Sequence, residues 1–251
     1  LGECKALSHL NLRDNALGDE GAGIMARVLG QCTALEHLDL SLNQIGFVGA
    51  GGLGEMLQEC KVLAHLDLSS NDIGDLGTQR LARVLGKFGA LTHLSLSSNE
   101  IGVAGTVGLA GVLGECTALQ HLNLNHNHIL SEGADKLAEV LGKCKALSHL
   151  DLGRNQICSK GAARLALVLG ELDALAHLNL SDNPISDDGA GALAAVLGDS
   201  KAGIHLDLTF CRIFFEGGRN LVDVLGECKG LAHLNLSCNP ITEEGEKQLK
   251  C

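Results

Sequence analysis

The sequence predicts an α/β solenoid, in which short parallel strands line an inner arc and helices cover the outer side. Three observations predict it: a period of 28 residues without an insertion, a strand-like alternation at the start of each unit, and a helix-like spacing in its second half. Such a period is typical of an array in which each unit buries its apolar face against its neighbours. We therefore expect one elongated domain over residues 1–251.

Each unit opens with an apolar residue followed by x-His-Leu-x-Leu, as in Leu-Ala-His-Leu-Asp-Leu at 63–68. Gly203 is the one opening residue that is not Leu. Both ends of the chain fall within a unit and show no polar capping repeat, so we expect a fragment of a longer protein. About nine units start at residues 7, 35, 63, 91, 119, 147, 175, 203 and 231.

The first half of a unit has the pattern of a strand and a turn. In residues 63–90, Leu66 and Leu68 alternate with His65 and Asp67, which is the period of a strand with one buried face. Asn71 then stands among apolar neighbours. We expect its amide to bind backbone groups at the turn, because buried backbone groups need partners.

The second half has the pattern of an amphipathic helix. Leu81, Val84 and Leu85 have the spacing of one helix face, Gly74 permits the bend before them, and Gly86 is a plausible stop. Parallel strands lie about 4.8 Å apart, whereas packed helices need about 8–10 Å. The array must therefore curve into a horseshoe, with right-handed connections and the strands inside.

The phrase Leu-x-x-Leu-x-Leu-x-x-Asn-x-Ile, followed by Gly-Ala-x-x-Leu-Ala-x-Val-Leu-Gly at 133–142, resembles leucine-rich repeats. The 28-residue length is similar to the ribonuclease-inhibitor subclass, which includes the sensor repeats of NOD-like receptors and the GTPase-activating protein of the nuclear-transport GTPase. The resemblance covers the whole chain and implies the fold. It implies protein binding without naming a partner, because the subclass binds many unrelated proteins.

Composition excludes several classes of function. The formal charge is −11, with 30 acidic and 19 basic residues, so no nucleic-acid partner is expected. No apolar run approaches the roughly 20 residues of a membrane span, so no membrane insertion is expected. Phosphate-binding glycine loops and Cys-x-x-Cys metal spacings are absent from the sequence. We therefore predict neither an enzyme nor a cofactor.

Most cysteines share one position of the repeat, which Phe88, Leu172 and Ser200 fill in other units. A position that accepts Cys, Phe and Leu is an apolar core position, where free Cys acts as a small hydrophobe. This favours a reducing, cytoplasmic compartment over a disulfide framework. The cysteines at this position are Cys4, Cys32, Cys60, Cys116, Cys144 and Cys228.

Two positions vary freely at the end of the strand and in the loop after it. Varied chemistry on a rigid frame suits a recognition surface, although solvent-facing loops also tolerate any residue. The eighth position holds Asp14, Leu42, Ser70, Ser98, His126, Arg154, Asp182, Phe210 and Cys238, and the tenth holds Ala16, Gln44, Asp72, Glu100, His128, Gln156, Pro184, Arg212 and Pro240.

Acidic residues dominate the expected inner face, which predicts a partner with a basic patch. Only Arg13, Arg154 and Arg212 oppose them. The acids include Asp14, Glu36, Asp39, Asp67, Asp72, Glu100, Asp151, Asp182 and Asp207.

A histidine occupies the third position of every unit. Metal binding is disfavoured, because in-register side chains point alongside each other and do not converge. Stacking into a neutral polar ladder is the simplest interpretation. A second hypothesis is that mild acid, between pH 7.5 and 5.5, makes the inner face basic and changes binding. The column is His9, His37, His65, His93, His121, His149, His177, His205 and His233.

Two units depart from the pattern. In the fifth, His126 and His128 join His121, and with Glu100 a weak Zn or Ni site is conceivable, although ordinary surface substitutions are favoured. In the eighth, Cys211 replaces the turn Asn among Phe residues. These aromatics are interpreted as interface anchors, the alternative being that they plug a local irregularity. The candidate binding residues there are Phe210, Arg212, Phe214 and Phe215.

Together these features predict a non-catalytic module that binds a protein partner on the inner sheet and the adjacent loops. One alternative is regulation of a GTPase in trans, although the acidic tail of that relative is absent here. Another is a structural subunit of a large assembly, held through its convex side. A consensus design is disfavoured, because the fifth to eighth units drift from the pattern.

Overall fold

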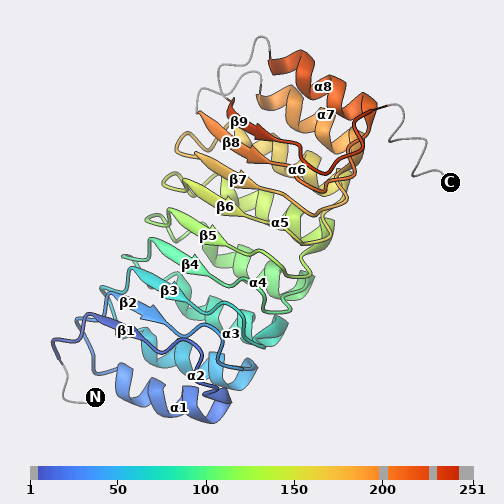
Figure 1. Cartoon of the computed structure of the whole chain (residues 1–251). Coiled ribbons are helices and arrows are strands. Elements are labelled where there is room, and N and C mark those ends of the chain that lie inside the picture. Colours follow the sequence, from blue (N-terminus) through green and yellow to red (C-terminus); the bar gives the residue numbers. More distant parts are fainter. Residues whose placement is uncertain (1–4, 198–202, 226–230, 243–251) are drawn as a thin grey trace.

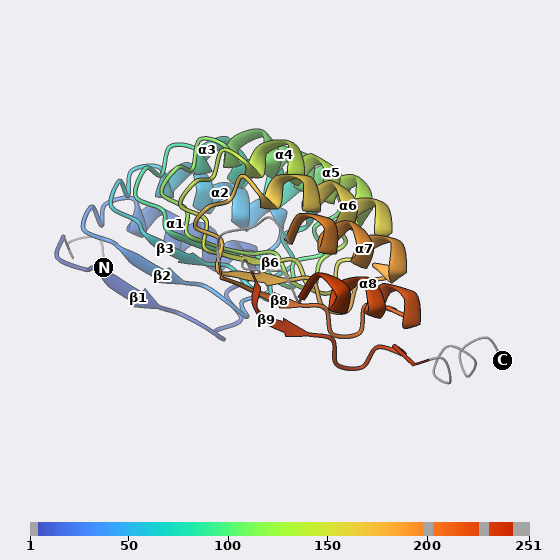
Figure 2. The ribbon, with the colours of Figure 1, turned by 90° about the horizontal axis from the view of Figure 1, so that it is seen from above.

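A computed structural model describes residues 5–197, 203–225 and 231–242. Nine strands form one parallel sheet in sequence order, and the helices pack behind one face of that sheet (Figure 1). Seen from above, the helices form an outer arc over the strands (Figure 2). The predicted α/β solenoid, with strands inside and helices outside, is confirmed.

The strands begin at the column histidine in seven of the nine units and are short. They are β1 (His9–Asn11), β2 (His37–Asp39), β3 (His65–Asp67), β4 (His93–Ser95), β5 (His121–Asn123), β6 (His149–Asp151), β7 (His177–Asn179), β8 (Ile204–Asp207) and β9 (Leu231–Asn235). The helices within the described ranges are α1 (Gly18–Leu29), α2 (Phe47–Leu57), α3 (Gly74–Leu85), α4 (Val103–Leu113), α5 (Leu130–Leu141), α6 (Ser159–Leu169), α7 (Ser186–Leu197) and α8 (Phe215–Leu225).

The constant period sets the register of the sheet. Each strand residue from β1 to β7 pairs with the residue 28 positions later, as His65 does with His93. Equivalent positions therefore form continuous columns across the sheet. Between β8 and β9 the register shifts, because Ile204 pairs with Leu231 while His205 pairs with His233.

The core is a stack of aliphatic layers between the sheet and the helices. Leu66, Leu68, Ile73, Leu81 and Leu85 form one layer, and each is at most 1% exposed. The apolar residues that the sequence assigned to the inner side of the strand and to the helix face are therefore the buried ones.

The turn asparagines act as predicted. Asn71 is buried, and its Oδ1 accepts hydrogen bonds from the backbone N–H groups of Asn43 and Ile45 at 3.0 and 2.9 Å. Its Nδ2 donates to the carbonyls of Leu40 and Leu68. One side chain thus supplies partners to backbone groups of two successive repeats, where water cannot reach.

The shared cysteine position lies in the core. Cys32, Cys60, Cys116 and Cys144 are buried free thiols, and Phe88 takes the same place. Burial raises the pKa of the Cys60 and Cys116 thiols to about 11. The other expected members of this position, Cys4, Cys228 and Ser200, lie outside the described residues.

The helices start in two alternating ways. The 28-residue pattern did not predict this alternation, because it describes all units as equal. Helices α1, α3, α5 and α7 have 12 residues, whereas α2, α4, α6 and α8 have 11. The longer ones begin at a residue with left-handed backbone, such as Gly74 with φ 57°. Helix α3 ends at Leu85 as predicted, but Gly86 keeps right-handed helical backbone.

A side chain from one unit caps the shorter helix of the next, and this side chain is acidic at α2, α4 and α8 and is Ser131 at α6. Asp75 Oδ1 accepts hydrogen bonds from the N–H groups of Gly102 and Gly105, both at 2.7 Å, at the start of α4. Asp19 binds Gly46 and Gly49 at the start of α2 in the same way. A carboxylate is favourable there, because it satisfies free N–H groups and faces the positive end of the helix dipole.

Candidate partner-binding surface

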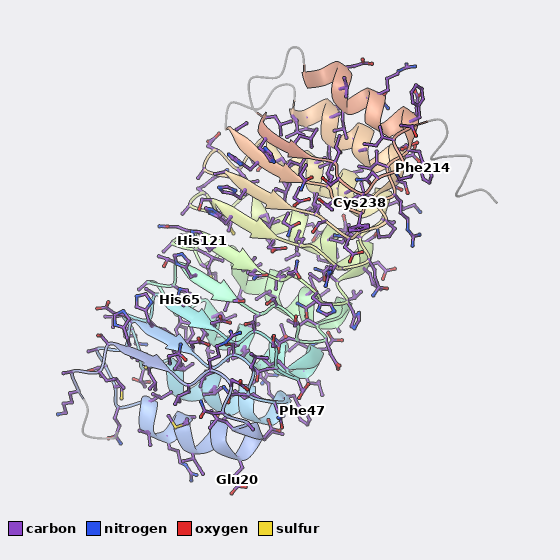
Figure 3. All side chains as sticks on the ribbon, in the orientation of Figure 1. Glu20, Phe47, His65, His121, Phe214 and Cys238 are labelled. Atoms are coloured by element: carbon purple, nitrogen blue, oxygen red, sulfur yellow. The ribbon has the colours of Figure 1, made fainter. Side chains whose placement is uncertain are left out.

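The nine histidines form a stacked column on the inner face of the sheet. Neighbouring ring centroids are 4.0 to 5.7 Å apart, and all but the last two pairs are stacked, with planes inclined by 11 to 29°. His65 and His121 mark this column in Figure 3. The rings lie alongside each other, as the fixed register predicts. Within the described ranges, no group of three or more His, Cys, Asp or Glu side chains is arranged to hold a metal ion.

Hydroxyl groups contact the Nδ1 atoms of part of the column. Ser148 Oγ lies 3.1 Å from the carbonyl oxygen of Gln120 and 2.9 Å from His149 Nδ1. The same carbonyl also accepts the backbone N–H groups of Ser148 and His149 at 2.8 and 2.9 Å. Each of these hydroxyl contacts holds one edge of the imidazole ring in place. Thr92 and His93 repeat this arrangement.

The middle of the column resists protonation. Burial and the neighbouring imidazoles lower the pKa of His93 to about 4, and the same causes lower the pKa of His121 and His149. Stacked imidazolium ions would repel each other at these distances. His93 therefore resists taking up a proton at pH 5.5. A change of the inner face to positive charge, as the mild-acid hypothesis requires, would need a lower pH at this residue.

The second inner column, at the fifth position, serves the turn as well as the surface. Asp39 Oδ1 accepts hydrogen bonds from the N–H of Ser41 at 2.9 Å and from its hydroxyl at 2.7 Å. Asp67 accepts from the N–H of Ser69 at 2.8 Å, and Asp151 from that of Gly153 at 2.9 Å. These three predicted binding residues are thus half-buried and serve as hydrogen-bond acceptors in the turn.

The loops after the strands share one strained backbone conformation. The residue at the eighth position has φ between 53° and 59° in all nine units, a region that non-glycine residues rarely adopt. Among the predicted binding residues, this group includes His126, Arg154, Asp182 and Phe210, which are all exposed. The fold fixes the backbone at this position and leaves the side chain free to vary.

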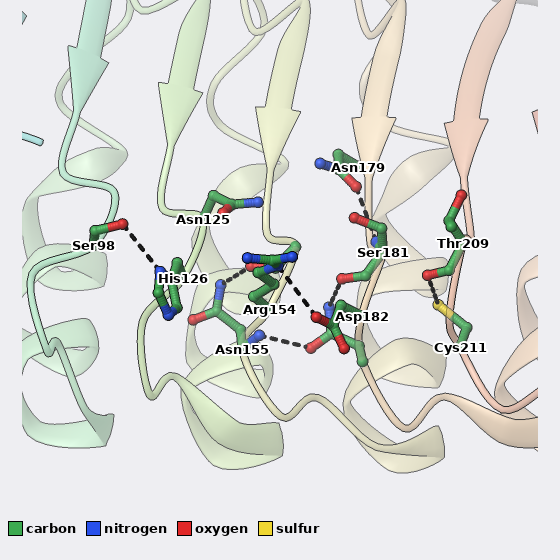
Figure 4. Close-up of polar contacts among 12 residues, drawn as sticks. Ser98, Asn125, His126, Arg154, Asn155, Asn179, Ser181, Asp182, Thr209 and Cys211 are labelled. Atoms are coloured by element: carbon green, nitrogen blue, oxygen red, sulfur yellow. Dashed lines mark hydrogen bonds and ion pairs between the residues drawn. The ribbon is translucent and has the colours of Figure 1, made fainter. Parts of the chain in front are cut away.

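Some predicted loop residues contact one another or their neighbours. Arg154 Nε donates to Asp182 Oδ2 at 3.2 Å, and both side chains are more than half exposed. Ser98 Oγ lies 3.2 Å from His126 Nδ1, and Gln156 Nε2 lies 3.0 Å from His128 Nδ1. Figure 4 shows the first two of these contacts. Asp72, Glu100 and Arg212 are also exposed in these loops.

The eighth unit exposes aromatic rings, as expected for its loop. Phe210 is 59% exposed and Phe215 39%, while Phe214 is half-buried. Cys211 stands in for the turn Asn: its thiol donates to the carbonyl of Leu180 at 3.2 Å. It supplies no amide oxygen, and the N–H of Ile185 bonds to the carbonyl of Asn183 instead.

The structure therefore distributes the predicted residues over three neighbouring places. The first is the inner sheet, with Asp39, Asp67 and Asp151. The second is the row of loops at the strand ends, and the third is the start of α8. The loop residues are Asp72, Glu100, His126, His128, Arg154, Asp182, Phe210 and Arg212, and at the third place Phe214 directly precedes α8 and Phe215 is its first residue.

An apolar surface that the repeat pattern did not predict lies at the start of α2 and α3. Phe47, Val48 and Leu76 are 43%, 51% and 58% exposed, and the guanidinium of Arg80 lies 5.3 Å from the centre of the Phe47 ring. Phe47 lies on the same lateral edge of the solenoid as Phe214, near the other end (Figure 3). The signal was the apolar pair Phe47–Val48, in positions where the preceding unit carries Asp19 and Glu20.

The outer side also has a shallow depression of about 330 Å³ between α5 and α6, beside Leu167, which is 63% exposed. Along the described ranges, no helix is long and apolar enough to cross a membrane.

The comparison with protein families agrees with this architecture. The family model described as Leucine Rich repeat matches residues 3–23, 31–54, 59–82, 91–110, 115–138, 143–166, 175–194 and 228–246. A search of curated proteins gave no match. Among solved structures, the chain is similar to one titled leiomodin-1 actin-binding site 2, with 21% identity, a TM-score of 0.49, and coverage of 56% of this chain and 82% of that one. The matched repeats span well over half of the sequence, and the chain belongs to the leucine-rich repeat family, with 28-residue strand–helix units of the ribonuclease-inhibitor type.

Proposed function

We propose that this chain is a non-catalytic protein-interaction module, whose inner sheet and adjacent loops bind a protein with a basic patch. The observation that carries the proposal is the uncompensated acidity of this surface. Of its acidic side chains, only Asp182 forms an ion pair within the described part of the chain. The other carboxylates remain available to cationic groups of a partner.

Among the described residues, no catalytic constellation stands out, which supports a binding role. The fifth-position residues form a second column, here called the Asx column, which holds Asn or Asp in every unit except at Ser95. This column and the histidine column repeat their pairing along the sheet, so no single pair is set apart as a catalytic site. Leucine-rich repeats typically act as scaffolds for protein interaction. The buried free thiols fit a reducing compartment, which we propose for this protein.

The test is affinity capture from a lysate of the source cells with three forms of the chain. The inner-face variant carries Asp39→Asn, Asp67→Asn and Asp151→Asn. Asparagine removes the charge but keeps the acceptor for the turn, as Asn123 shows by accepting the N–H of Asn125 at 3.0 Å. The matched control removes three exposed charges from helices: Glu55→Gln, Glu139→Gln and Asp223→Asn.

We expect a protein that the wild type and the control capture and that the inner-face variant loses. Equal capture by all three forms would contradict the inner-face site. Loss with the control alone would move the interaction to the convex side, near Leu167, and favour a structural subunit of a larger complex. Regulation of a GTPase in trans would show as a GTPase among the proteins lost with the inner-face variant.

A further inference from the structure

Two adjoining depressions lie on the inner face between the histidine column and the Asx column. They have volumes of about 280 and 270 Å³ and share His177 and Asn179, so together they form one groove across β5 to β9. We call it the inner groove. Its lining comprises His121, Leu122, Asn123, His149, Leu150, Asp151, His177, Leu178, Asn179, His205, Leu206, Asp207, His233 and Asn235.

The polar lining of the inner groove consists of carboxylates, amides and imidazoles. No Lys or Arg lines either depression. Burial and the neighbouring imidazoles lower the pKa of His121 and His149, which disfavours a positive charge on these rings. The groove therefore carries negative charge from carboxylates, with no cation of its own to offset it.

Two carboxylates of the groove are incompletely satisfied. Asp151 receives the N–H of Gly153 and the amide of Asn125 on Oδ1 alone, and its Oδ2 accepts no hydrogen bond from a described residue. Asp207 receives Thr209 on Oδ1, while its Oδ2 has one long contact of 3.4 Å with Asn235. Neither residue is in an ion pair within the described ranges.

We propose that the inner groove binds an extended, Lys- or Arg-bearing segment of the partner, with one cationic side chain on Asp151 and another on Asp207. This inference rests on the proposed function and names the part of the partner that the inner face recognises. A phosphate-bearing ligand is disfavoured by the same carboxylates, because like charges would be brought together.

The strand spacing fixes the spacing of the two cations. Asp151 and Asp207 lie on β6 and β8, two strand intervals apart, which is about 9.6 Å at the backbone. A polyproline II chain advances about 9.3 Å in three residues and presents residues i and i+3 on one side. A β-strand advances only about 6.8 Å between neighbouring residues of one face. The groove therefore selects Lys-x-x-Lys or its arginine equivalent in a polyproline II conformation.

The test uses labelled peptides and the full chain, with fluorescence anisotropy as the readout. One peptide is Pro- and Ala-rich with two lysines three residues apart. A second has the same composition with adjacent lysines, and a third has Gln in place of Lys. The groove variant is Asp151→Asn with Asp207→Asn, and the matched control is Glu55→Gln with Asp223→Asn, which removes two exposed charges from helices α2 and α8.

We expect the peptide with lysines three residues apart to bind best. The groove variant should weaken its affinity about tenfold, because two partly exposed ion pairs are lost. The control variant should change this affinity much less. Equal weakening by both variants, equal binding of the two lysine peptides, or no binding of the peptide with lysines three residues apart would overturn the inference. Any of these results would leave the proposed function unaffected if, in the capture experiment, the inner-face variant no longer binds the protein that the wild type captures. Thermal melts check that both variants are folded.

Discussion

The imidazoles of His93 and His121 stack with ring centroids 4.0 Å apart and planes inclined by 14°. Among the interactions that lower the pKa of His93, burial comes first and the charge of His121 second. Replacing His121 by Gln removes that charge, so we expect the pKa of His93 to rise from about 4 toward 6.5. NMR titration of the imidazole resonances measures it. An unchanged or lower pKa would show that the stacked pair does not couple.

The lowered histidine pKa values also predict how stability depends on pH. An unfolded chain has histidines with a pKa of about 6.5, so between that pH and about 4 it binds more protons than the folded chain. Stability is therefore full above pH 6.5 and falls as the pH drops toward 4. Urea denaturation across this range should show a falling midpoint. His93→Gln should flatten this dependence, and a slope as steep as that of the wild type would contradict the assignment.

Asn71→Ala should destabilise the array strongly. The change removes the acceptor of two buried N–H groups and the donor to the Leu40 and Leu68 carbonyls. Each unpaired buried group costs about 1–3 kcal/mol, so we expect a loss of more than 2 kcal/mol in the free energy of unfolding. Asp72→Ala, at the exposed neighbouring position, should stay within about 0.5 kcal/mol. Similar losses for both variants in urea melts would contradict the role of Asn71.

The cap that Asp75 provides to α4 should be replaceable by serine. Asp75→Ala removes the acceptor of two N–H groups and should cost about 1 kcal/mol. Asp75→Ser should cost less, because Ser131 fills the equivalent place and accepts the N–H of Cys158 at 3.0 Å. Thermal denaturation of the two variants distinguishes them. A serine variant no more stable than the alanine variant would mean that the carboxylate charge is what matters.

Phe210→Asn should leave the fold intact and weaken capture of the partner. The ring is 59% exposed and its backbone φ is 56°, a conformation that asparagine adopts more readily than phenylalanine. We expect an unchanged or slightly raised melting temperature. A loss of more than about 1 kcal/mol of stability would instead support the hypothesis that this aromatic plugs a local irregularity.

Much of the fold follows from the repeat alone. The period of 28 residues predicted the sheet order and register, because an array without insertions sets each strand beside its equivalent. The alternation around Leu66 and Leu68 identified the buried face, and the lone polar Asn71 predicted a backbone-binding amide. These features are local and recur in each unit, so the sequence displays them repeatedly.

The candidate surface was only partly predictable. The exposed variable loops were identified, but the pairing of Arg154 with Asp182 and the turn hydrogen bonds of Asp39 and Asp151 were not. The same carboxylate pattern fits both a free surface charge and a turn acceptor. Only the position of the backbone N–H group two residues later shows whether the carboxylate is a free surface charge or a turn acceptor.

The sequence by itself determined the unit, its core positions, the columns across the sheet and the acidic balance of the inner face. The tertiary structure decided the stacking that lowers the histidine pKa values, the alternating helix starts with their caps from the neighbouring unit, and the inner groove. The physical reason is that pKa shifts, caps between units and grooves depend on distances of a few ångströms between residues about 28 positions apart. A sequence pattern gives the order of residues along the chain, and only the packed structure gives those distances.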